Sequence, residues 1–267
     1  MERIGLIAGN RRFPILLAQS AKRKGCYIVA VAVRNDTSPS LKKYVDRIYW
    51  LRLDEFSRLF EIFKQEGIKK VVMAGQISPQ RLFSKEVVRS PHLQGLLGRM
   101  KDKKADTIFS AVAGELAGSG IELADSTIFM KEAIPSEGVL TVKKPSLQDK
   151  ENIDFGFQLA KSVAGLDIGQ TVAVANKIIV AVEALEGTDN LIKRAGRISR
   201  GGFTLVKVSK PKQDQRFDIP VVGTATVLNL ARSKAAGLVI EAGKTLFLDR
   251  DQAVRLADRK GLFITAL

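Results

Sequence analysis

Two short apolar runs near the N-terminus end in the same pair of residues, Ala-Gly, and this ending constrains the fold more than any other sequence feature. Residues 4–8 are followed by Gly9, and Lys70–Ala74 are followed by Gly75. Short, continuously apolar runs are typical of buried strands in a parallel sheet. A glycine directly after such a strand lets the backbone turn tightly. The pattern therefore predicts two turns along one edge of a parallel sheet, which is the usual ligand-binding edge.

Short strands alternate with helical periodicity through the first half of the chain. Helical spacing of apolar residues follows Pro14, recurs after Asp54, which we predict to cap a helix at 55–66, and appears again at 106–117. Further strands are predicted at Tyr27–Val33, 48–53 and 121–124. This alternation is typical of an α/β fold and predicts a Rossmann-like parallel-sheet domain over residues 1–125. The turn after the first strand, Gly-Asn-Arg-Arg-Phe-Pro, lacks the Gly-x-Gly-x-x-Gly fingerprint of dinucleotide sites.

The pattern changes after residue 125. Residues 126–145 contain Pro135, Gly138 and Pro145 without sustained periodicity, which predicts a linker between domains. Beyond it, a helix at 147–164, a β-hairpin formed by 171–175 and 178–184, and further strands and helices predict a distinct C-terminal α/β domain over residues 146–267. No internal repeat makes the two halves copies of each other.

The composition limits the chemistry that the chain can perform. It contains one histidine, His92, and one cysteine, Cys26, which excludes intramolecular disulfides and metal sites built from several of these residues. We expect His92 to lie on the surface. The net charge of +15 indicates an anionic partner, but the aromatic content of only 6% argues against single-stranded nucleic acid. Carboxylates, lysines, arginines, hydroxyls and a hard ion such as Mg²⁺ remain as catalytic groups.

The hydropathy of the chain bears on its location. No apolar run approaches the ~20 residues that span a bilayer, and the chain opens with a strand-like run instead of a signal segment. We therefore expect a cytoplasmic protein, either soluble or peripheral to the inner membrane. Attraction of its lysines and arginines to anionic lipid is a further explanation of the positive charge.

Residues 210–223 concentrate the groups that suit phosphate chemistry. They read Lys-Pro-Lys-Gln-Asp-Gln-Arg-Phe-Asp-Ile-Pro-Val-Val-Gly, between a strand-like run at 203–208 and a helix-like run at 224–236. Proline removes backbone donors and fixes φ, so we predict a loop carried by rigid elements, where reacting groups are usually displayed. Asp214 and Asp218 beside cationic side chains suit a phosphorylated substrate that is both held and attacked. A solvated basic loop is the alternative interpretation.

A second loop, Glu-Gly-Thr-Asp at 186–189, precedes a predicted helix from Asn190. Thr188 or Asp189 is expected to cap this helix, whose amide donors then face the loop. The alternative to a functional role is that Asp189 only caps the helix and Glu186 is a surface residue.

Several motifs occur in an order that matches a known family. They are Leu-Ile-Ala-Gly at 6–9, Phe-Pro at 13–14, Ala-Gly at 74–75, Asp-Ile-Gly-Gln at 167–170, Val-Glu-Ala-Leu-Glu-Gly-Thr-Asp at 182–189, Lys-Pro-x-Gln-Asp-x-Arg-Phe-Asp-Ile-Pro at 210–220, Glu-Ala-Gly at 241–243 and Leu-Asp-Arg at 248–250. The chain thereby resembles the UDP-2,3-diacylglucosamine pyrophosphatases of the LpxI type, from lipid A biosynthesis. One departure is the turn after Ala8-Gly9, where Asn10-Arg11-Arg12 replaces the usual glycine-rich continuation.

The resemblance implies hydrolysis of UDP-2,3-diacylglucosamine to UMP and 2,3-diacylglucosamine 1-phosphate. It also implies Mg²⁺ dependence, action at the cytoplasmic face of the membrane, a homodimer, and a substrate site between a Rossmann-like domain and a distinct C-terminal domain. Nucleic acid is not an expected partner. A nucleotide-sugar-binding protein without hydrolytic activity is the alternative, and release of UMP separates the two.

The resemblance and the needs of pyrophosphate hydrolysis together give expected roles for individual residues. Asp218 matches the essential carboxylate of the family, and we expect it to orient or deprotonate the attacking water, directly or as a metal ligand. Asp189 and Asp214 are candidates to complete the Mg²⁺ site. The expected substrate contacts are Gly9, Asn10, Gly75 and Gln76 on the N-terminal sheet edge, Gln170 and Thr188 in the C-terminal domain, and Lys210 and Arg216 on phosphate oxygens.

Overall fold

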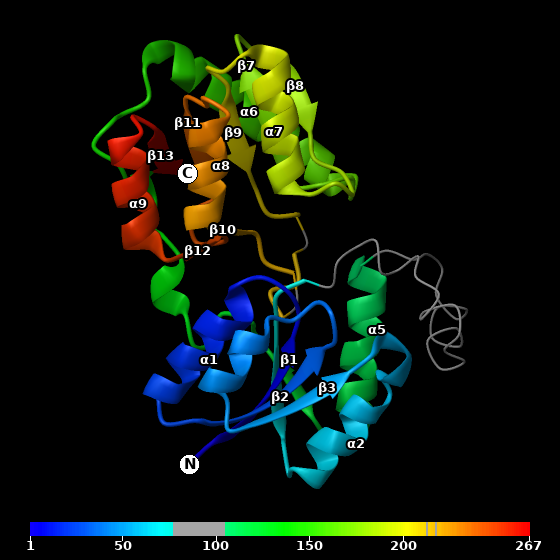
Figure 1. The fold of residues 1–267 in the computed structure, drawn as a ribbon. Helices are drawn as coiled ribbons and strands as arrows, with labels where there is room; N and C mark the ends of the chain where they lie inside the picture. The colour runs from blue at the N-terminus through cyan, green and yellow to red at the C-terminus, as the bar shows by residue number, and fades with distance from the viewer. Residues whose placement is uncertain (77–104, 212, 217) are drawn as a thin grey trace. The chain divides into compact units, whose positions relative to one another are not determined.

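The chain folds into two compact units (Figure 1). The computed structural model describes residues 1–76, 105–211, 213–216 and 218–267, so His92 and the basic stretch at 80–104 lie outside the described residues. The N-terminal unit comprises Met1–Met130 together with Asp214–Asp218, and the C-terminal unit comprises Lys131–Gln213 and Ile219–Leu267. Five residues of the loop at 210–223 therefore belong to the N-terminal unit, although the sequence on both sides of them belongs to the other.

The N-terminal unit is built on a five-stranded parallel sheet with the order β3-β2-β1-β4-β5. Its elements are β1 (Arg3–Ala8), α1 (Phe13–Arg23), β2 (Tyr27–Val33), η1 (Pro39–Tyr44), β3 (Arg47–Leu51), η2 (Leu53–Glu55), α2 (Arg58–Gln65), β4 (Lys70–Ala74), α5 (Ala105–Gly118) and β5 (Glu122–Ala124). The predicted parallel α/β class is thereby confirmed. The chain continues from β1 to β2 on one side, whereas β4 pairs with the other side of β1. This change of direction makes the carboxyl ends of β1 and β4 a topological switch point.

The predicted helix at 55–66 begins later than expected, and Asp54 does not cap it. A short 3₁₀ turn, η2, is followed by α2 from Arg58. The carboxylate of Asp54 accepts a hydrogen bond from Arg52 Nε at 2.9 Å, while Glu55 Oε2 accepts from the backbone N–H of Arg52 at 3.0 Å. The guanidinium of Arg52 therefore binds the carboxylate that we predicted to accept hydrogen bonds from the helix amides.

The C-terminal unit contains a six-stranded mixed sheet with the order β6-β13-β11-β9-β7-β8 and a two-stranded sheet, β10-β12. Strands β9, β11 and β13 are parallel, whereas β6, β7 and β8 each pair antiparallel with a neighbour. The elements are η4 (Lys131–Ala133), β6 (Gly138–Val139), α6 (Leu147–Gly165), β7 (Thr171–Ala175), β8 (Ile178–Val182), α7 (Thr188–Ser199), β9 (Thr204–Lys207), β10 (Val221–Gly223), α8 (Thr224–Arg232), β11 (Gly237–Ile240), β12 (Leu246–Leu248), α9 (Arg250–Arg259) and β13 (Phe263–Ala266).

The side chains of this sheet alternate between two apolar layers. One face packs against α6, with Val174, Val206 and Val239 buried beneath that helix. The other face packs against α7, α8 and α9, with Leu205 and Leu238 among its buried strand residues (Figure 1). A distinct α/β unit in the C-terminal half is therefore confirmed.

The predicted hairpin between β7 and β8 is also confirmed. Its two turn residues, Asn176 and Lys177, have φ of 51° and 56°. Left-handed conformations at both positions are what a two-residue hairpin turn of the I′ kind requires. Asparagine tolerates this conformation better than most residues.

A buried aromatic ring packs directly on a glycine between two of the parallel strands. Phe263 in β13 is fully buried, and β11 begins with Gly237, which pairs with Phe263 in the sheet. A Cβ atom at Gly237 would lie 2.5 Å from three atoms of the ring. Such an approach is sterically forbidden, so the absence of a side chain at this position sets the packing of the aromatic ring.

We expect Gly237→Ala to lower the free energy of unfolding by about 1–3 kcal/mol, because the added methyl group must displace a ring in a close-packed core. Gly114→Ala in α5 is the matched control, since no described atom beyond its chain neighbours and its own helix backbone lies within 4 Å of its Cβ position. That substitution should be neutral or stabilising by up to ~1 kcal/mol through helix propensity. Urea denaturation measures both; equal stability of the two variants would contradict the proposed packing.

Candidate functional site

The turns after β1 and β4 interlock at the carboxyl edge of the N-terminal sheet. The N–H of Gly9 donates to the carbonyl of Ala74 at 2.8 Å, and the N–H of Asn10 donates to the carbonyl of Gln76 at 2.7 Å. The structure therefore confirms that the turns following the two strands lie side by side. Whether this edge contacts substrate stays a prediction.

Both glycines of these turns are required by geometry. A Cβ atom at Gly9 would lie 2.4 Å from the carbonyl oxygen of Gln76. Gly75 has φ of 82°, and a Cβ atom there would lie 2.5 Å from the carbonyl oxygen of Asn10. Side chains are excluded at both positions, so backbone amides and carbonyls form this part of the edge.

The segment Asp214–Asp218 is attached to the N-terminal unit by Ser126, which follows β5. Both the N–H and the Oγ of Ser126 donate to the carbonyl of Gln215, at 3.1 and 2.7 Å. The N–H of Asp218 donates to the carbonyl of Asp214 at 2.9 Å, which closes a turn between the two carboxylates. Because β1, β4 and β5 are parallel, this turn is held at the same sheet edge as Gly9 and Gly75.

Asp214 is engaged by Arg216 within this turn. Arg216 Nε donates to Asp214 Oδ1 at 2.9 Å and Nη2 donates to Oδ2 at 2.6 Å, in a bidentate pair. The side-chain hydrogen bond from Arg216 lowers the pKa of Asp214, and burial only partly opposes it. Two residues predicted for different roles, metal binding and phosphate binding, are therefore paired with each other in the structure.

A buried polar cluster lies where α7 begins in the C-terminal unit. Lys207 Nζ donates to Thr188 Oγ1 at 2.8 Å, and Thr188 Oγ1 donates to Glu183 Oε1 at 2.7 Å. Lys207 Nζ also lies 3.9 Å from Glu183 Oε2, and the two side chains are only 9% and 12% exposed. Thr188 is thus held between a buried cation and a buried carboxylate.

The prediction that Thr188 or Asp189 caps α7 is wrong. The residue before the helix is Gly187, and no side chain caps its amides. Thr188 is the first helical residue and hydrogen-bonds to Glu183, while Asp189 Oδ1 accepts from the side-chain amide of Asn229 at 2.9 Å. Both side chains therefore form hydrogen bonds with residues outside the helix, Thr188 with Glu183 and Asp189 with Asn229.

Lys210 and Gln170 lie in the same unit, where β9 ends and β7 begins. Lys210 Nζ is 2.6 Å from Asp167 Oδ1, and its backbone N–H donates to Gln213 Oε1 at 2.5 Å. The carbonyl of Gln170 accepts from the N–H of Val208 at 2.9 Å. The Asp-Ile-Gly-Gln motif therefore contacts the root of the loop at 210–223 through its first and last residues.

Glu241 forms a second anchor for this root. Its side chain is 8% exposed, and its Oε2 accepts hydrogen bonds from the N–H and the Oγ of Ser209 at 2.8 and 2.9 Å. Lys161 Nζ lies 3.0 Å from Oε2, and Lys244 Nζ lies 2.7 Å from Oε1. Burial acts to raise the pKa of Glu241, but the hydrogen bonds from Lys244, Ser209 and Lys161 outweigh it and lower the pKa to about 2.

Sequence reasoning missed Lys207, Glu183 and Glu241 as site-forming residues. A lysine inside the apolar run at 203–208 was the available signal for Lys207, because a buried ammonium requires polar partners. Glu183 and Glu241 stood in motifs that carried the family resemblance, but their partners are far away in sequence.

The predicted metal ligands are divided between the two units. Asp214 and Asp218 belong to the N-terminal unit, and Asp189 belongs to the C-terminal unit. Among the residues whose placement is described, no group of three or more His, Cys, Asp or Glu side chains is assembled that could hold a metal ion.

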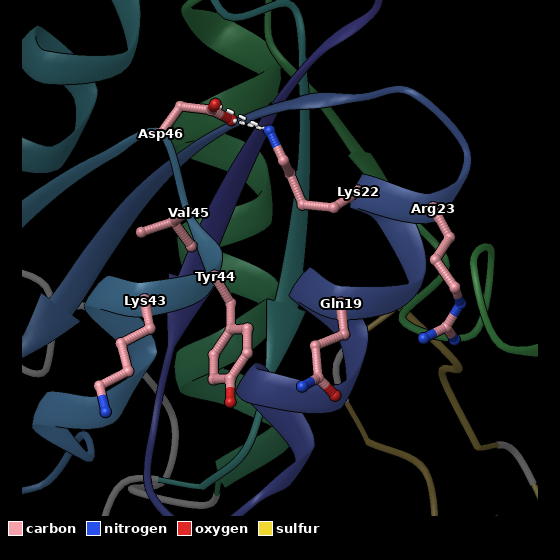
Figure 2. Close-up of a pocket in the computed structure, with 7 residues that line it drawn as sticks. All are labelled: Gln19, Lys22, Arg23, Lys43, Tyr44, Val45 and Asp46. Atoms are coloured by element: carbon pink, nitrogen blue, oxygen red, sulfur yellow. Dashed lines mark hydrogen bonds and ion pairs between the residues drawn. The ribbon is translucent and has the colours of Figure 1, made fainter.

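A hollow of about 550 Å³ on the N-terminal unit lies away from these residues (Figure 2). Asp46 in its wall accepts a hydrogen bond from the N–H of Ile28 at 2.7 Å, near the amino ends of β2 and β3. Lys22 Nζ lies 2.8 Å from Asp46 Oδ1, so its charge is compensated inside the hollow. The lining residues are Gln19, Lys22, Arg23, Lys43, Tyr44, Val45 and Asp46. None of the predicted site residues is among them.

Family models match the chain along almost its full length. The LpxI N-terminal domain matches residues 3–133, and the LpxI C-terminal domain matches residues 136–265. The curated UDP-2,3-diacylglucosamine pyrophosphatase LpxI of Caulobacter vibrioides is 32% identical over 277 residues, which cover 99% of this chain and 97% of the relative.

Similarity to solved structures is much weaker. The biotin carboxylase subunit of a pyruvate carboxylase aligns with 75% of this chain and 42% of its own, at 14% identity and a TM-score of 0.29. N5-carboxyaminoimidazole ribonucleotide synthetase from Thermotoga maritima aligns with 70% of this chain and 43% of its own, at 19% identity and a TM-score of 0.25. The chain spans less than half of either structure, and we draw nothing about fold or function from them.

Membrane-spanning helices are absent from the described residues, because no helix there combines the length and the apolar character needed to cross a membrane.

The depressed pKa of Glu241 predicts a specific pH dependence. Its ordinary value is 4.5 and its folded value is about 2, so the ionised side chain stabilises the fold above pH 4.5, and this contribution is lost as the pH falls toward 2. Glu241→Gln cannot titrate. The stability advantage of wild type over Glu241→Gln at pH 6 should therefore shrink by up to about 3 kcal/mol as the pH falls from 4.5 toward 2. Urea denaturation at several pH values measures it; a difference that grows on acidification would contradict the assignment.

Proposed function

The chain belongs to the LpxI family, and we propose that it hydrolyses the pyrophosphate bond of UDP-2,3-diacylglucosamine to UMP and 2,3-diacylglucosamine 1-phosphate. The observation that carries this proposal is the similarity to the curated pyrophosphatase, which is 32% identical over 99% of the chain. Matches to both family domains support it, because together they extend from residue 3 to residue 265.

Asp218 is proposed as the catalytic carboxylate that orients or deprotonates the attacking water. Hydrolysis of a pyrophosphate needs an aligned water and stabilisation of the leaving phosphate. The turn that carries Asp218 is closed by its own N–H and is held to the sheet edge by Ser126. Asp214, the other carboxylate of the turn, is paired with Arg216, so it is less suited to accept a proton.

Cations and backbone amides are proposed to bind the phosphates. In the N-terminal unit, the turns at Gly9, Asn10, Gly75 and Gln76 lie at the same sheet edge as Asp218, with Arg216 on the same turn. In the C-terminal unit, Lys210, Gln170 and Thr188 are proposed to contact the substrate, and Lys207 holds the hydroxyl of Thr188 in place. Fixed charges of this kind neutralise phosphate oxygens without reorganisation during the reaction.

The chemistry of these donors fits Mg²⁺, which prefers hard oxygen ligands and needs only one or two protein carboxylates. Asp218 is proposed to hold the ion, and Asp189, which belongs to the C-terminal unit, stays a candidate from the sequence. Asp214 fits this role less well than the sequence indicated, because both of its oxygens accept hydrogen bonds from Arg216. When bound, the ion neutralises charge on the pyrophosphate oxygens.

The protein is proposed to act in the cytoplasm at the inner membrane surface, as a homodimer. The net charge of +15 supports attraction to anionic lipid, which amounts to ~1 kcal/mol per Lys or Arg near the surface. The proposed substrate carries two acyl chains, so weak attachment to that surface would bring enzyme and substrate together. The dimer rests on the family resemblance.

Replacement of Asp218 tests the catalytic proposal. Asp218→Ala should lower kcat for UMP release by at least ~100-fold, because a positioned acid or base contributes typically 10²–10⁴-fold. Its melting temperature should stay close to that of wild type, because the side chain lies on a partly exposed loop. Asp251→Ala is the matched control, since Asp251 is exposed in α9, and it should retain wild-type turnover.

Turnover by Asp218→Ala at the control rate would remove Asp218 from the mechanism. Wild-type protein that binds UDP-2,3-diacylglucosamine without releasing UMP would instead support a nucleotide-sugar-binding protein. Binding measured by calorimetry and UMP measured by chromatography separate these outcomes.

Metal dependence is tested separately. Wild-type activity should be lost in excess EDTA and should return on addition of Mg²⁺, because a hard ion is proposed to neutralise the pyrophosphate. Mg²⁺ should raise the melting temperature of wild type more than that of Asp218→Ala, since a ligand that binds only the folded state stabilises it. Full activity in excess EDTA would contradict the proposed dependence on Mg²⁺.

A further inference from the structure

We infer that Glu241 is a positioning residue, which fixes the point where the loop carrying Asp218 leaves the C-terminal sheet. The inference rests on the proposed role of Asp218 and deepens it. Glu241 is argued to act through Ser209 and the loop, so it is distinct from the groups that contact substrate.

Glu241 continues the pairing of two parallel strands beyond their ends. Strands β9 and β11 pair in register up to Lys207 and Ile240. Glu241 follows Ile240 directly, and its carboxylate accepts the N–H of Ser209 at 2.8 Å and the Oγ at 2.9 Å. The carboxylate of Glu241 thus accepts the backbone N–H of Ser209 just beyond the end of the β9–β11 pairing. Ser209 itself is only 1% exposed.

Lys161 completes this anchor from the helix above the sheet. Its Nζ, on α6, donates to the carbonyl of Ser209 at 2.9 Å and to both oxygens of Glu241 at 3.1 and 3.0 Å. The N–H and the carbonyl of Ser209 are therefore both held, one by a carboxylate and the other by an ammonium group. An apolar side chain at position 241 could fill the same space but could not receive the Ser209 amide.

The anchor lies at the root of the loop. After Ser209, the backbone N–H of Lys210 donates to Gln213 Oε1, and Lys210 Nζ pairs with Asp167. The chain then joins the N-terminal unit at Asp214. Glu241 and Lys161 therefore hold the loop root at Ser209, two residues beyond the end of β9. Positioning errors of about 1 Å in such a support can cost ~100-fold in rate.

Glu241→Gln tests the inference, because the amide keeps the size of the side chain but replaces one acceptor oxygen with a donor. The replaced group faces donors on Ser209, Lys161 and Lys244. We expect kcat for UMP release to fall about 10- to 100-fold with KM changed less than about threefold. Hydrogen exchange at the amides of residues 209–218 should accelerate, since the Ser209 amide loses its ionised acceptor. Assays are run well below the melting temperature of each variant.

Two further variants sharpen the result. Ser209→Ala removes the hydroxyl but keeps the amide, so it should give a smaller change in the same direction for both kcat and exchange. Glu151→Gln is the matched control, because Glu151 is also a carboxylate of this unit, but it is exposed and pairs with Lys177 at 3.1 Å. It should retain wild-type kcat and wild-type exchange.

The inference is overturned if Glu241→Gln melts at a lower temperature but keeps the wild-type kcat and the wild-type exchange of residues 209–218. Should Glu241→Gln fail to fold, Ser209→Ala decides by the same two readouts. A wild-type protein that releases no UMP would overturn the proposed function. The exchange measurement needs no substrate, so it shows independently whether Glu241 fixes the loop.

Discussion

Parallel pairing of neighbouring strands brings residues that are distant in sequence to one edge of the sheet in each unit. In the N-terminal unit, β1, β4 and β5 run in the same direction, so Gly9, Gly75 and Ser126 are brought to a single edge although they are distant in sequence. In the C-terminal unit, the parallel pairing of β9 with β11 brings Ser209 beside Glu241. Carboxyl ends of parallel strands meet at one edge by geometry alone, and the residues that follow them need only short turns to converge.

The loop at 210–223 depends on this geometry at two separate places. Its root is held in the C-terminal unit by Glu241 and Lys161, and its residues Asp214–Asp218 are held in the N-terminal unit by Ser126. A loop of this length without anchors would sample many conformations, at a cost of roughly 1–2 kcal/mol per residue when it orders. Hydrogen bonds to its backbone at both places therefore reduce the conformational freedom of the loop.

Local patterns predicted the elements well, whereas contacts between distant residues could not be predicted. The strands Tyr27–Val33 and Lys70–Ala74 have the bounds that their apolar residues indicated, and the turn at Asn176 and Lys177 follows from local backbone preferences. Asp54 was wrongly assigned to a helix cap because a guanidinium two residues away competes for its carboxylate.

The site residues that the sequence analysis missed are held by polar contacts with residues that are distant in sequence. Glu241 could be recognised only as part of a motif, because Lys161 and Ser209 reach it through the packing of α6 and the order of strands. The roles proposed for the predicted site residues still depend on experiment.

Asp214, one of the two aspartates in the loop at 210–223, is fixed by its neighbours in the fold. Asp214 forms a bidentate pair with Arg216, which lowers its pKa, and its carbonyl closes the turn by accepting the N–H of Asp218. A carboxylate held this way is stabilised as an anion and is a weak base, so its contribution is to shape the turn. The Asp214–Arg216 pair thus gives a physical reason why Asp214 is a poorer proton acceptor and a poorer metal ligand than the sequence indicated.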